Sequence, residues 1–250
     1  MKQNKIYIYG KHAVMEALSH APWALDKIFL AKENGNEALA GAARRAGVPV
    51  SSLGPKKFSG RNLGSVSHQG VVGRVLLSKL VKSYDDFIRN LEIGPDTSLA
   101  LLGGVQDPHN AGAIIRSAAA FGISGVLVPK HNQAPITGAV AKVSAGMVFR
   151  VPIVEIGNVN AAIRDLKSRG FWIYGLDGRA EKAVTDELYE KPTVFVLGNE
   201  SEGLRQKTSE LCDMLVSIPM HPRCESLNVA ASAAVTFFAW SLQHPGVLKK

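Results

Sequence analysis

Residues 106–122, QDPHNAGAIIRSAAAFG, place a single arginine, Arg116, in an apolar segment. The pattern predicts a helix over 112–121, with Asn110 as its N-cap and Gly122 at its end. Alanine, isoleucine and phenylalanine occupy nearly every face of that helix, so we expect most of it to be buried. A buried guanidinium needs an anion, and its planar set of donors matches the oxygens of a phosphate.

The surrounding sequence offers Arg116 no acidic partner. No Asp or Glu occurs between residues 108 and 154, whereas Arg116, Lys130, Lys142 and Arg150 all lie there. A bound phosphate is therefore one candidate for the anion. Two alternatives stay open: Arg116 extends into solvent, or it pairs with a carboxylate distant in the sequence.

Two further groups of polar residues follow apolar runs that predict strands. GNESEG, residues 198–203, follows TVFVL, and MHPRCESLN, residues 220–228, follows MLVSIP. Ligands bind at the carboxyl ends of strands in open α/β sheets, so we expect these loops and QDPHN to meet at one ligand-binding edge. Taken singly, Asn110 and Ser226 also suit helix N-caps, Glu200 suits a solvated loop, and the glycines suit turns.

The usual nucleotide signatures are absent. G-x-G-x-x-G after a strand, the P-loop and the G-x-S-x-G elbow do not occur, which argues against an oxidoreductase with a nucleotide cofactor. Gly198 instead comes directly after a predicted strand, where a residue without a side chain lets a ligand approach the backbone.

The charge of the chain is concentrated at one end. Net charge is +8, and residues 1–75 hold 11 lysines and arginines against 4 aspartates and glutamates. Such a module favours a polyanion such as nucleic acid, with a solvated basic surface as the alternative. The sequence predicts no amphipathic basic helix of the kind that would favour a membrane as the partner. Cys212 and Cys224 lack metal-ligand spacing, and no signal peptide or spanning stretch is evident, so we expect a cytoplasmic protein without metal.

The alternation of apolar runs predicts an α/β protein with two domains. Residues 1–75 predict a small basic αβ domain, and the looser segment 76–97 predicts a linker. Regular alternation over 98–250 predicts a parallel sheet, because its strand runs are apolar throughout, as strands buried on both faces are.

The three groups of polar residues described above, in their order and spacing along the chain, resemble the motifs of the SpoU-type RNA 2′-O-ribose methyltransferases of the SPOUT superfamily. IYGKHAVMEAL and HQGVVGRV also resemble the accessory N-terminal domain of the rRNA-modifying members, and HPRC, residues 221–224, departs from the family pattern. The motifs are DPHNAGAIIRSA with Asn110, Gly112 and Arg116, FVLGNESEGL with Gly198, Glu200 and Gly203, and the pieces 218–220 and 225–230.

The resemblance implies a SPOUT domain with a trefoil knot, a substrate-binding N-terminal domain and S-adenosylmethionine as cofactor. Arg116 would contact the phosphate beside the target ribose, Asn110 and Asn228 would position the ribose hydroxyl, and Glu200 and Ser226 would orient these groups. The implied cofactor pocket consists of Leu197, Gly198, Asn199, Gly203, Ile218, Met220 and Leu227.

The resemblance also implies RNA and a second copy of the chain as partners. The substrate it points to is a guanosine of 23S rRNA, with tRNA or an inactive RNA-binding protein as alternatives. Phe237, Phe238 and Trp240 near the end of the predicted helix 228–243 suit either the core or a homodimer contact. The expected RNA contacts are Arg116, Lys56, Lys57, Arg61, Lys142 and Arg150.

Overall fold

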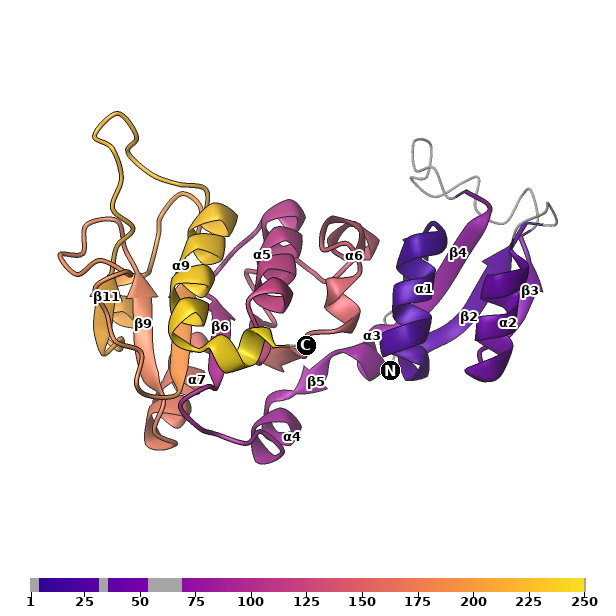
Figure 1. Cartoon of the computed structure of the whole chain (residues 1–250), viewed down its shortest axis with the longest axis horizontal. Coiled ribbons are helices and arrows are strands. Elements are labelled where there is room, and N and C mark those ends of the chain that lie inside the picture. The colour runs from indigo at the N-terminus through magenta and orange to yellow at the C-terminus, as the bar shows by residue number, and fades with distance from the viewer. Residues whose placement is uncertain (1–4, 32–35, 54–68, 250) are drawn as a thin grey trace. The chain divides into compact units, whose positions relative to one another are not determined.

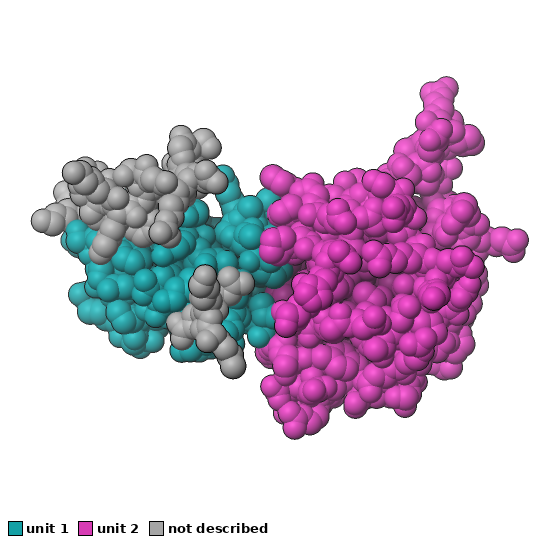
Figure 2. Space-filling view, turned by 180° about the vertical axis from the view of Figure 1, so that it is seen from behind, with its two compact units in different colours: residues 1–81, 136–150 teal, residues 82–135, 151–250 magenta. Residues whose placement is uncertain are grey.

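A computed structural model describes most of the chain as two compact units (Figure 1). The first unit joins residues 1–81 with residues 136–150, and the second joins residues 82–135 with residues 151–250 (Figure 2). The described residues are 5–31, 36–53 and 69–249.

The first unit is built on a mixed four-stranded sheet in the order β1-β4-β2-β3. Its helix α2 buries Leu39 and Ala43, four residues apart and therefore on one face. The strands are β1 (Lys5–Tyr9), β2 (Leu25–Leu30), β3 (Val50–Ser52) and β4 (Val71–Leu76). The helices are α1 (Lys11–His20), η1 (Pro22–Ala24), α2 (Glu37–Arg45), α3 (Leu77–Leu80), α6 (Gly138–Val143) and η2 (Met147–Phe149).

Residues 136–150 complete the first unit, although the sequence predicts them within the domain 98–250. Helix α6 packs on β1 so closely that a Cβ at Gly138 would lie 2.1 Å from the carbonyl oxygen of Tyr7. Only glycine allows this approach. The carboxylate of Glu16 also receives Arg150 Nε at 2.8 Å and Nη2 at 3.1 Å. These contacts join positions far apart in sequence, which is why local patterns do not reveal them.

The second unit contains a seven-stranded parallel sheet in the order β11-β9-β10-β6-β7-β8-β5. As predicted, β6, β7 and β10 are buried along their whole length. The strands are β5 (Lys82–Ser83), β6 (Ser98–Leu102), β7 (Gly125–Pro129), β8 (Ile153–Ile156), β9 (Trp172–Leu176), β10 (Thr193–Leu197) and β11 (Met214–Val216). The helices are α4 (Tyr84–Arg89), α5 (Pro108–Ala120), α7 (Val159–Ser168), α8 (Gln206–Ser209), α9 (Val229–Gln243) and η3 (Pro245–Leu248).

Helices cover both faces of this sheet. Val194 and Val196 of β10 belong to the apolar cluster that takes in α4 and α7. Phe195, between them in sequence, points to the opposite face and meets the ring of Phe237 in α9 at 5.8 Å. Helix α5 packs beside α9 (Figure 1). The alternation along β10 thus fixes which helices lie on which face.

Residues 76–97, predicted as a linker, are structured. Leu76 ends β4, and α4 inserts Phe87 and Ile88 into the core of the second unit. The segment's charged residues are exposed, and they are spread over α3, β5, α4 and the turn that leads to β6.

The helix expected over 112–121 begins earlier, at Pro108. Asp107 rather than Asn110 is its N-cap, because the Asp107 carboxylate accepts the backbone N–H of His109 at 2.8 Å. The helix ends as predicted before Gly122, whose φ of +74° suits glycine. The prediction of Asn110 as the cap was therefore wrong.

Helix α9 has Asn228 as its N-cap, so Ser226 does not serve as one. Among the described residues, none of the helices combines the length and the apolar character needed to cross a membrane. The trefoil knot stays a prediction.

Candidate active site at the carboxyl edge of the parallel sheet

A pocket of about 450 Å³ lies in the second unit where β9, β10 and β11 end. Its walls come from the loops that follow these strands and from the start of α9. All of the expected cofactor residues line it: Leu197, Gly198, Asn199, Gly203, Ile218, Met220 and Leu227. The parallel topology brings them together because it places these strand ends at one edge.

The loop after β9 adds Asp177, Gly178 and Arg179 to the lining, which the sequence analysis missed. Asp177 accepts Arg179 Nε at 3.1 Å and Nη2 at 2.9 Å. The side-chain hydrogen bond from Arg179 lowers the pKa of Asp177. The run FWIYGLD carried a usable signal, since it predicts another parallel strand ending at the same edge.

The pocket is acidic. Its lining includes the carboxylates of Asp177, Glu200, Glu202 and Glu225, against the single guanidinium of Arg179. A concave lining with this balance attracts a ligand that carries net positive charge.

Residues 198–203 form a tight loop. Asn199 N–H donates to the Gly203 carbonyl at 2.9 Å, and Gly203 N–H donates back to the Asn199 carbonyl at 3.0 Å. A Cβ at Gly198 would lie 2.3 Å from the carbonyl carbon of Gly203. Glycine is therefore needed at position 198 because the backbone of Gly203 lies directly against it. The sequence suggested instead that Gly198 leaves room for a ligand.

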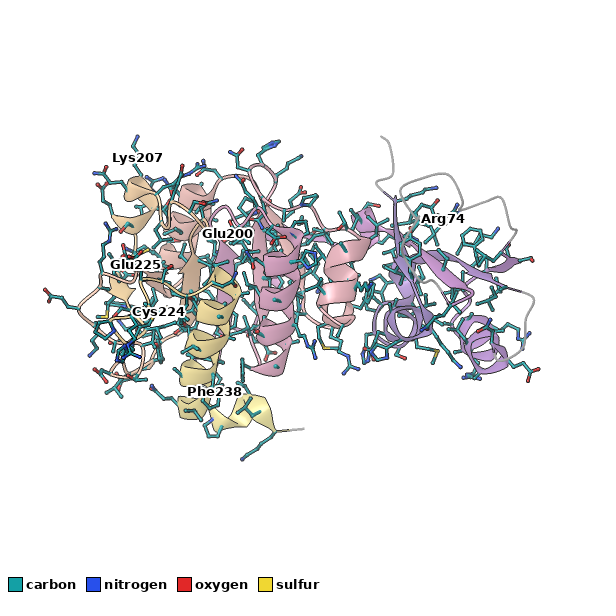
Figure 3. All side chains as sticks on the ribbon, turned by 90° about the horizontal axis from the view of Figure 1, so that it is seen from above. Arg74, Glu200, Lys207, Cys224, Glu225 and Phe238 are labelled. Carbon is teal, nitrogen blue, oxygen red and sulfur yellow. The ribbon has the colours of Figure 1, made fainter. Side chains whose placement is uncertain are left out.

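Glu200, labelled in Figure 3, joins the first two motif loops. One carboxylate oxygen accepts Asp107 N–H at 3.2 Å and Asn110 Nδ2 at 3.1 Å. The other accepts Gln106 N–H at 3.3 Å and Asn199 Nδ2 at 3.4 Å. The carboxylate thus holds the start of α5 against the loop that follows β10.

Partial burial acts to raise the pKa of Glu200, but hydrogen bonds from Asn110 and from the backbone of Glu200, Asp107 and Gln106 outweigh it and lower the pKa. The group is therefore an anion at neutral pH. Because the folded-state pKa is lowered, its stabilising contribution is present above the ordinary carboxyl pKa and is lost as pH falls through the folded value.

Asn228 connects the third motif loop to the first. Its Nδ2 donates to Asn110 Oδ1 at 3.0 Å, while its Oδ1 accepts Ala230 N–H at 2.8 Å. The helix cap fixes which way the Asn228 amide points. Three of the five predicted catalytic residues thus form a chain from Asn228 through Asn110 to Glu200.

Arg116 and Ser226 stand outside this chain. Arg116 is exposed, which is one of the alternatives that the sequence left open, because Ile114, Ile115 and Ala118 take the buried face of α5. It lies six residues beyond Asn110, about 9 Å along the helix axis. Within the described part of the chain, no carboxylate pairs with Arg116.

Ser226 is exposed and lines the pocket, where its carbonyl oxygen accepts the Cys224 thiol at 3.2 Å. Figure 3 shows Cys224 and Glu225 close together on this loop.

The remaining expected RNA contacts differ in their surroundings. Lys142 is exposed. Arg150 donates a hydrogen bond to Glu16, a partner that the sequence did not indicate, and this bond lowers the pKa of Glu16. Lys56, Lys57 and Arg61 lie outside the described residues.

Comparison with known families matches both units. The SpoU rRNA Methylase family matches residues 98–238, and the family described as RNA 2′-O ribose methyltransferase substrate binding matches residues 7–79. The first match covers β6 to β11 of the parallel sheet, together with residues 136–150 of the first unit, and the second covers most of the mixed sheet.

Curated relatives are similar over nearly their whole length. A 23S rRNA (guanosine-2′-O-)-methyltransferase RlmB of Xanthomonas axonopodis pv. citri is 37% identical over 95% of this chain and 96% of its own. The protein of the same name from Shewanella oneidensis is 35% identical over 95% of this chain and 97% of its own.

The fold is shared with solved structures. The SpoU methyltransferase AviRb from Streptomyces viridochromogenes, in complex with AdoMet, superposes with a TM-score of 0.83 at 23% identity, covering 96% of this chain and 91% of that one. The family matches and the relatives are decisive: the chain belongs to the SpoU family and is an RNA 2′-O-ribose methyltransferase that uses S-adenosylmethionine.

Proposed function

We propose that this enzyme methylates the ribose of a guanosine in 23S rRNA. The observation that carries this proposal is the 35–37% identity to enzymes named for that reaction, over 95% of the chain. The basic N-terminal module supports a large, highly charged substrate. An rRNA substrate would also place the enzyme in the cytoplasm.

The substrate is tested by methyl transfer from radiolabelled S-adenosylmethionine to separate 23S rRNA and tRNA transcripts. We expect label in 23S rRNA. After nuclease digestion of that rRNA, the label should be found in fragments that contain 2′-O-methylguanosine. Label in tRNA alone would contradict the rRNA assignment, and label in neither would favour an inactive RNA-binding protein.

We assign the cofactor to the acidic pocket at the ends of β9, β10 and β11. S-adenosylmethionine carries a sulfonium and an ammonium against one carboxylate, so its net positive charge fits the carboxylates of the lining. When bound, it supplies the electrophilic methyl group. The apolar side chains of Leu197, Ile218 and Leu227 suit the adenine, with backbone groups to read its edge.

The chain's own residues must hold the ribose and deal with the proton of its 2′-hydroxyl. A guanidinium stays protonated, so Arg116 is not the base. We assign Arg116 to the neighbouring phosphate, where its charge also stabilises negative charge that develops on the 2′-oxygen. The proton passes to that phosphate or to water.

The amides of Asn110 and Asn228 are assigned to positioning the ribose hydroxyl, and Ser226 is assigned to orienting these groups from the third loop. Glu200 acts through Asn110, since it accepts the Asn110 amide and both backbone N–H groups at the start of α5. We also assign RNA contacts to Lys142 and Arg150, and to the basic residues Lys56, Lys57 and Arg61.

Glu200→Ala should lower kcat by about tenfold to a hundredfold, because it leaves several donors without an acceptor. Cofactor affinity, measured by calorimetry, should change much less than kcat. Glu200→Gln keeps one carbonyl oxygen and should restore part of the rate, which a merely structural defect would not predict.

The control for this series is Glu181→Ala, which removes an exposed carboxylate outside the described hydrogen-bond network. If Glu200→Ala and Glu181→Ala have the same kcat, Glu200 does not position the motif loops.

We further propose that two copies associate through α9. Val235, Phe238 and Leu242 form an exposed apolar stripe, with exposed fractions of 40%, 47% and 61%. These positions share a face because they are three and four residues apart. Phe237 and Trp240, also candidates from the sequence, are instead fully buried in the core. The resemblance to homodimeric enzymes favours a second copy as the occupant of this stripe.

Phe238→Asp should convert the dimer into a monomer, because it places a charge in the middle of the apolar contact. Light scattering at micromolar concentration measures the mass directly. Trp23→Asp, at a 60% exposed aromatic residue of the first unit, is the control and should remain dimeric. A wild-type monomer at that concentration would rule out the assignment.

A further inference from the structure

A second pocket of about 590 Å³ lies at the same edge of the parallel sheet, where β6, β7 and β8 end. The start of α7 and the start of α8 close its other sides. None of the residues to which the resemblance gives a role lines it, so the three motifs leave this half of the edge unexplained.

The charge of this second pocket is opposite to that of the first. His131, Arg205 and Lys207 line it, and no carboxylate does. All three basic side chains are exposed, and within the described part of the chain none of them forms an ion pair. The nearby carboxylate of Glu210 is bonded instead to Gln206 Nε2, at 2.9 Å. The pocket therefore attracts an anion.

Neutral donors complete the lining. The buried hydroxyl of Thr208 donates to Asn160 Oδ1 at 2.9 Å, which leaves the Asn160 NH₂ group to donate elsewhere. Helix α7 also begins at the pocket, where Asn158 Oδ1 accepts Ala161 N–H at 3.0 Å. The positive end of this ten-residue helix reinforces the attraction for an anion.

The two pockets share a wall. Asn199, which lines the acidic pocket, donates its Nδ2 to the carbonyl oxygen of Gly104, which lines the basic one, at 2.9 Å. Figure 3 shows Lys207 and Phe238 at opposite sides of the second unit, so the basic pocket and the α9 stripe are separate surfaces.

We propose that the basic pocket binds a phosphodiester of the substrate RNA, with Arg205 and Lys207 as its charged contacts. The proposal rests on RNA being the substrate. It adds a grip on the strand that is separate from the cofactor pocket and from the phosphate assigned to Arg116.

The test compares Arg205→Ala/Lys207→Ala with wild type, using the full chain and total rRNA as the binding probe. Each phosphate contact contributes about 0.7 to 0.9 to the slope of log affinity against log salt, so the double variant should flatten that slope by about 1.4 to 1.8. The KM for RNA should rise with little change in kcat, and S-adenosylmethionine affinity should stay at the wild-type value.

The matched control, Arg164→Ala/Lys191→Ala, removes the same charge from exposed positions of the second unit outside both pockets. An equal loss of slope in both double variants would overturn the site, because it would reflect net charge alone. An unchanged slope, or a matching loss of cofactor affinity, would also overturn it. Binding to total rRNA does not depend on which nucleotide is methylated. A wrong 23S assignment would therefore be detected separately, in the methylation assay, where the wild-type enzyme would leave 23S rRNA unlabelled.

Discussion

Arg116→Ala should lower the rate of methyl transfer by about 10²- to 10³-fold, the loss typical of removing one preorganised donor to a developing negative charge. Cofactor affinity and thermal stability should stay at wild-type values. The physical reason is the position of the side chain: it is exposed on α5, so its removal leaves no buried group without a partner.

Arg116→Lys should restore little activity, because an ammonium keeps the charge but loses the planar pair of donors. Calorimetry with S-adenosylmethionine and a methylation assay on 23S rRNA measure the two effects separately. Arg164→Ala, which removes an exposed arginine from α7, controls for net charge. A rate above about a tenth of wild type in Arg116→Ala would contradict the assigned role.

Gly198→Ala should abolish measurable cofactor binding, although it adds only one methyl group. Its Cβ would lie 2.5 Å from the carbonyl oxygen of Gly203 and 2.6 Å from the backbone nitrogen of Leu204. Backbone atoms cannot rotate away as a flexible side chain does, so the loop must open. We expect a loss of stability of about 1 to 3 kcal/mol, as for other overpacked sites.

Gly178→Ala separates this effect from simple filling of the pocket. Gly178 lines the same pocket, yet a Cβ there would meet nothing within 4 Å. Gly178→Ala should therefore change cofactor affinity, measured by calorimetry, far less than Gly198→Ala does. Gly94→Ala is a control outside the pocket. Equal affinities in Gly198→Ala and wild type would show that the loop tolerates opening.

The sequence was most informative where structure is local. Apolar runs such as TVFVL correctly predicted the buried parallel strands, and the polar loops after them converge in the structure. The exposure of Arg116 was not predictable in this way. A helix rich in alanine has little amphipathic pattern, so composition does not reveal which side faces solvent.

Predictions that depend on distant contacts were less successful. The start of α5 was misplaced because Asp107 and Asn110 are both good caps, and Glu200, remote in sequence, engages the Asn110 amide. Arg150 has no local acid, yet Glu16 reaches it from the first unit's helix α1. Such pairings follow from topology, which no window of neighbouring residues contains.

The return of residues 136–150 to the first unit determines the order in which the chain can fold during synthesis. The ribosome releases the N-terminus first, but the first unit lacks α6 and Arg150 until residue 150 has emerged. By then β6, α5 and β7 of the second unit have already been made. Completion of the first unit is thus interleaved with growth of the second, and an exchange of the whole first unit between relatives has to include residues 136–150 as well as residues 1–81.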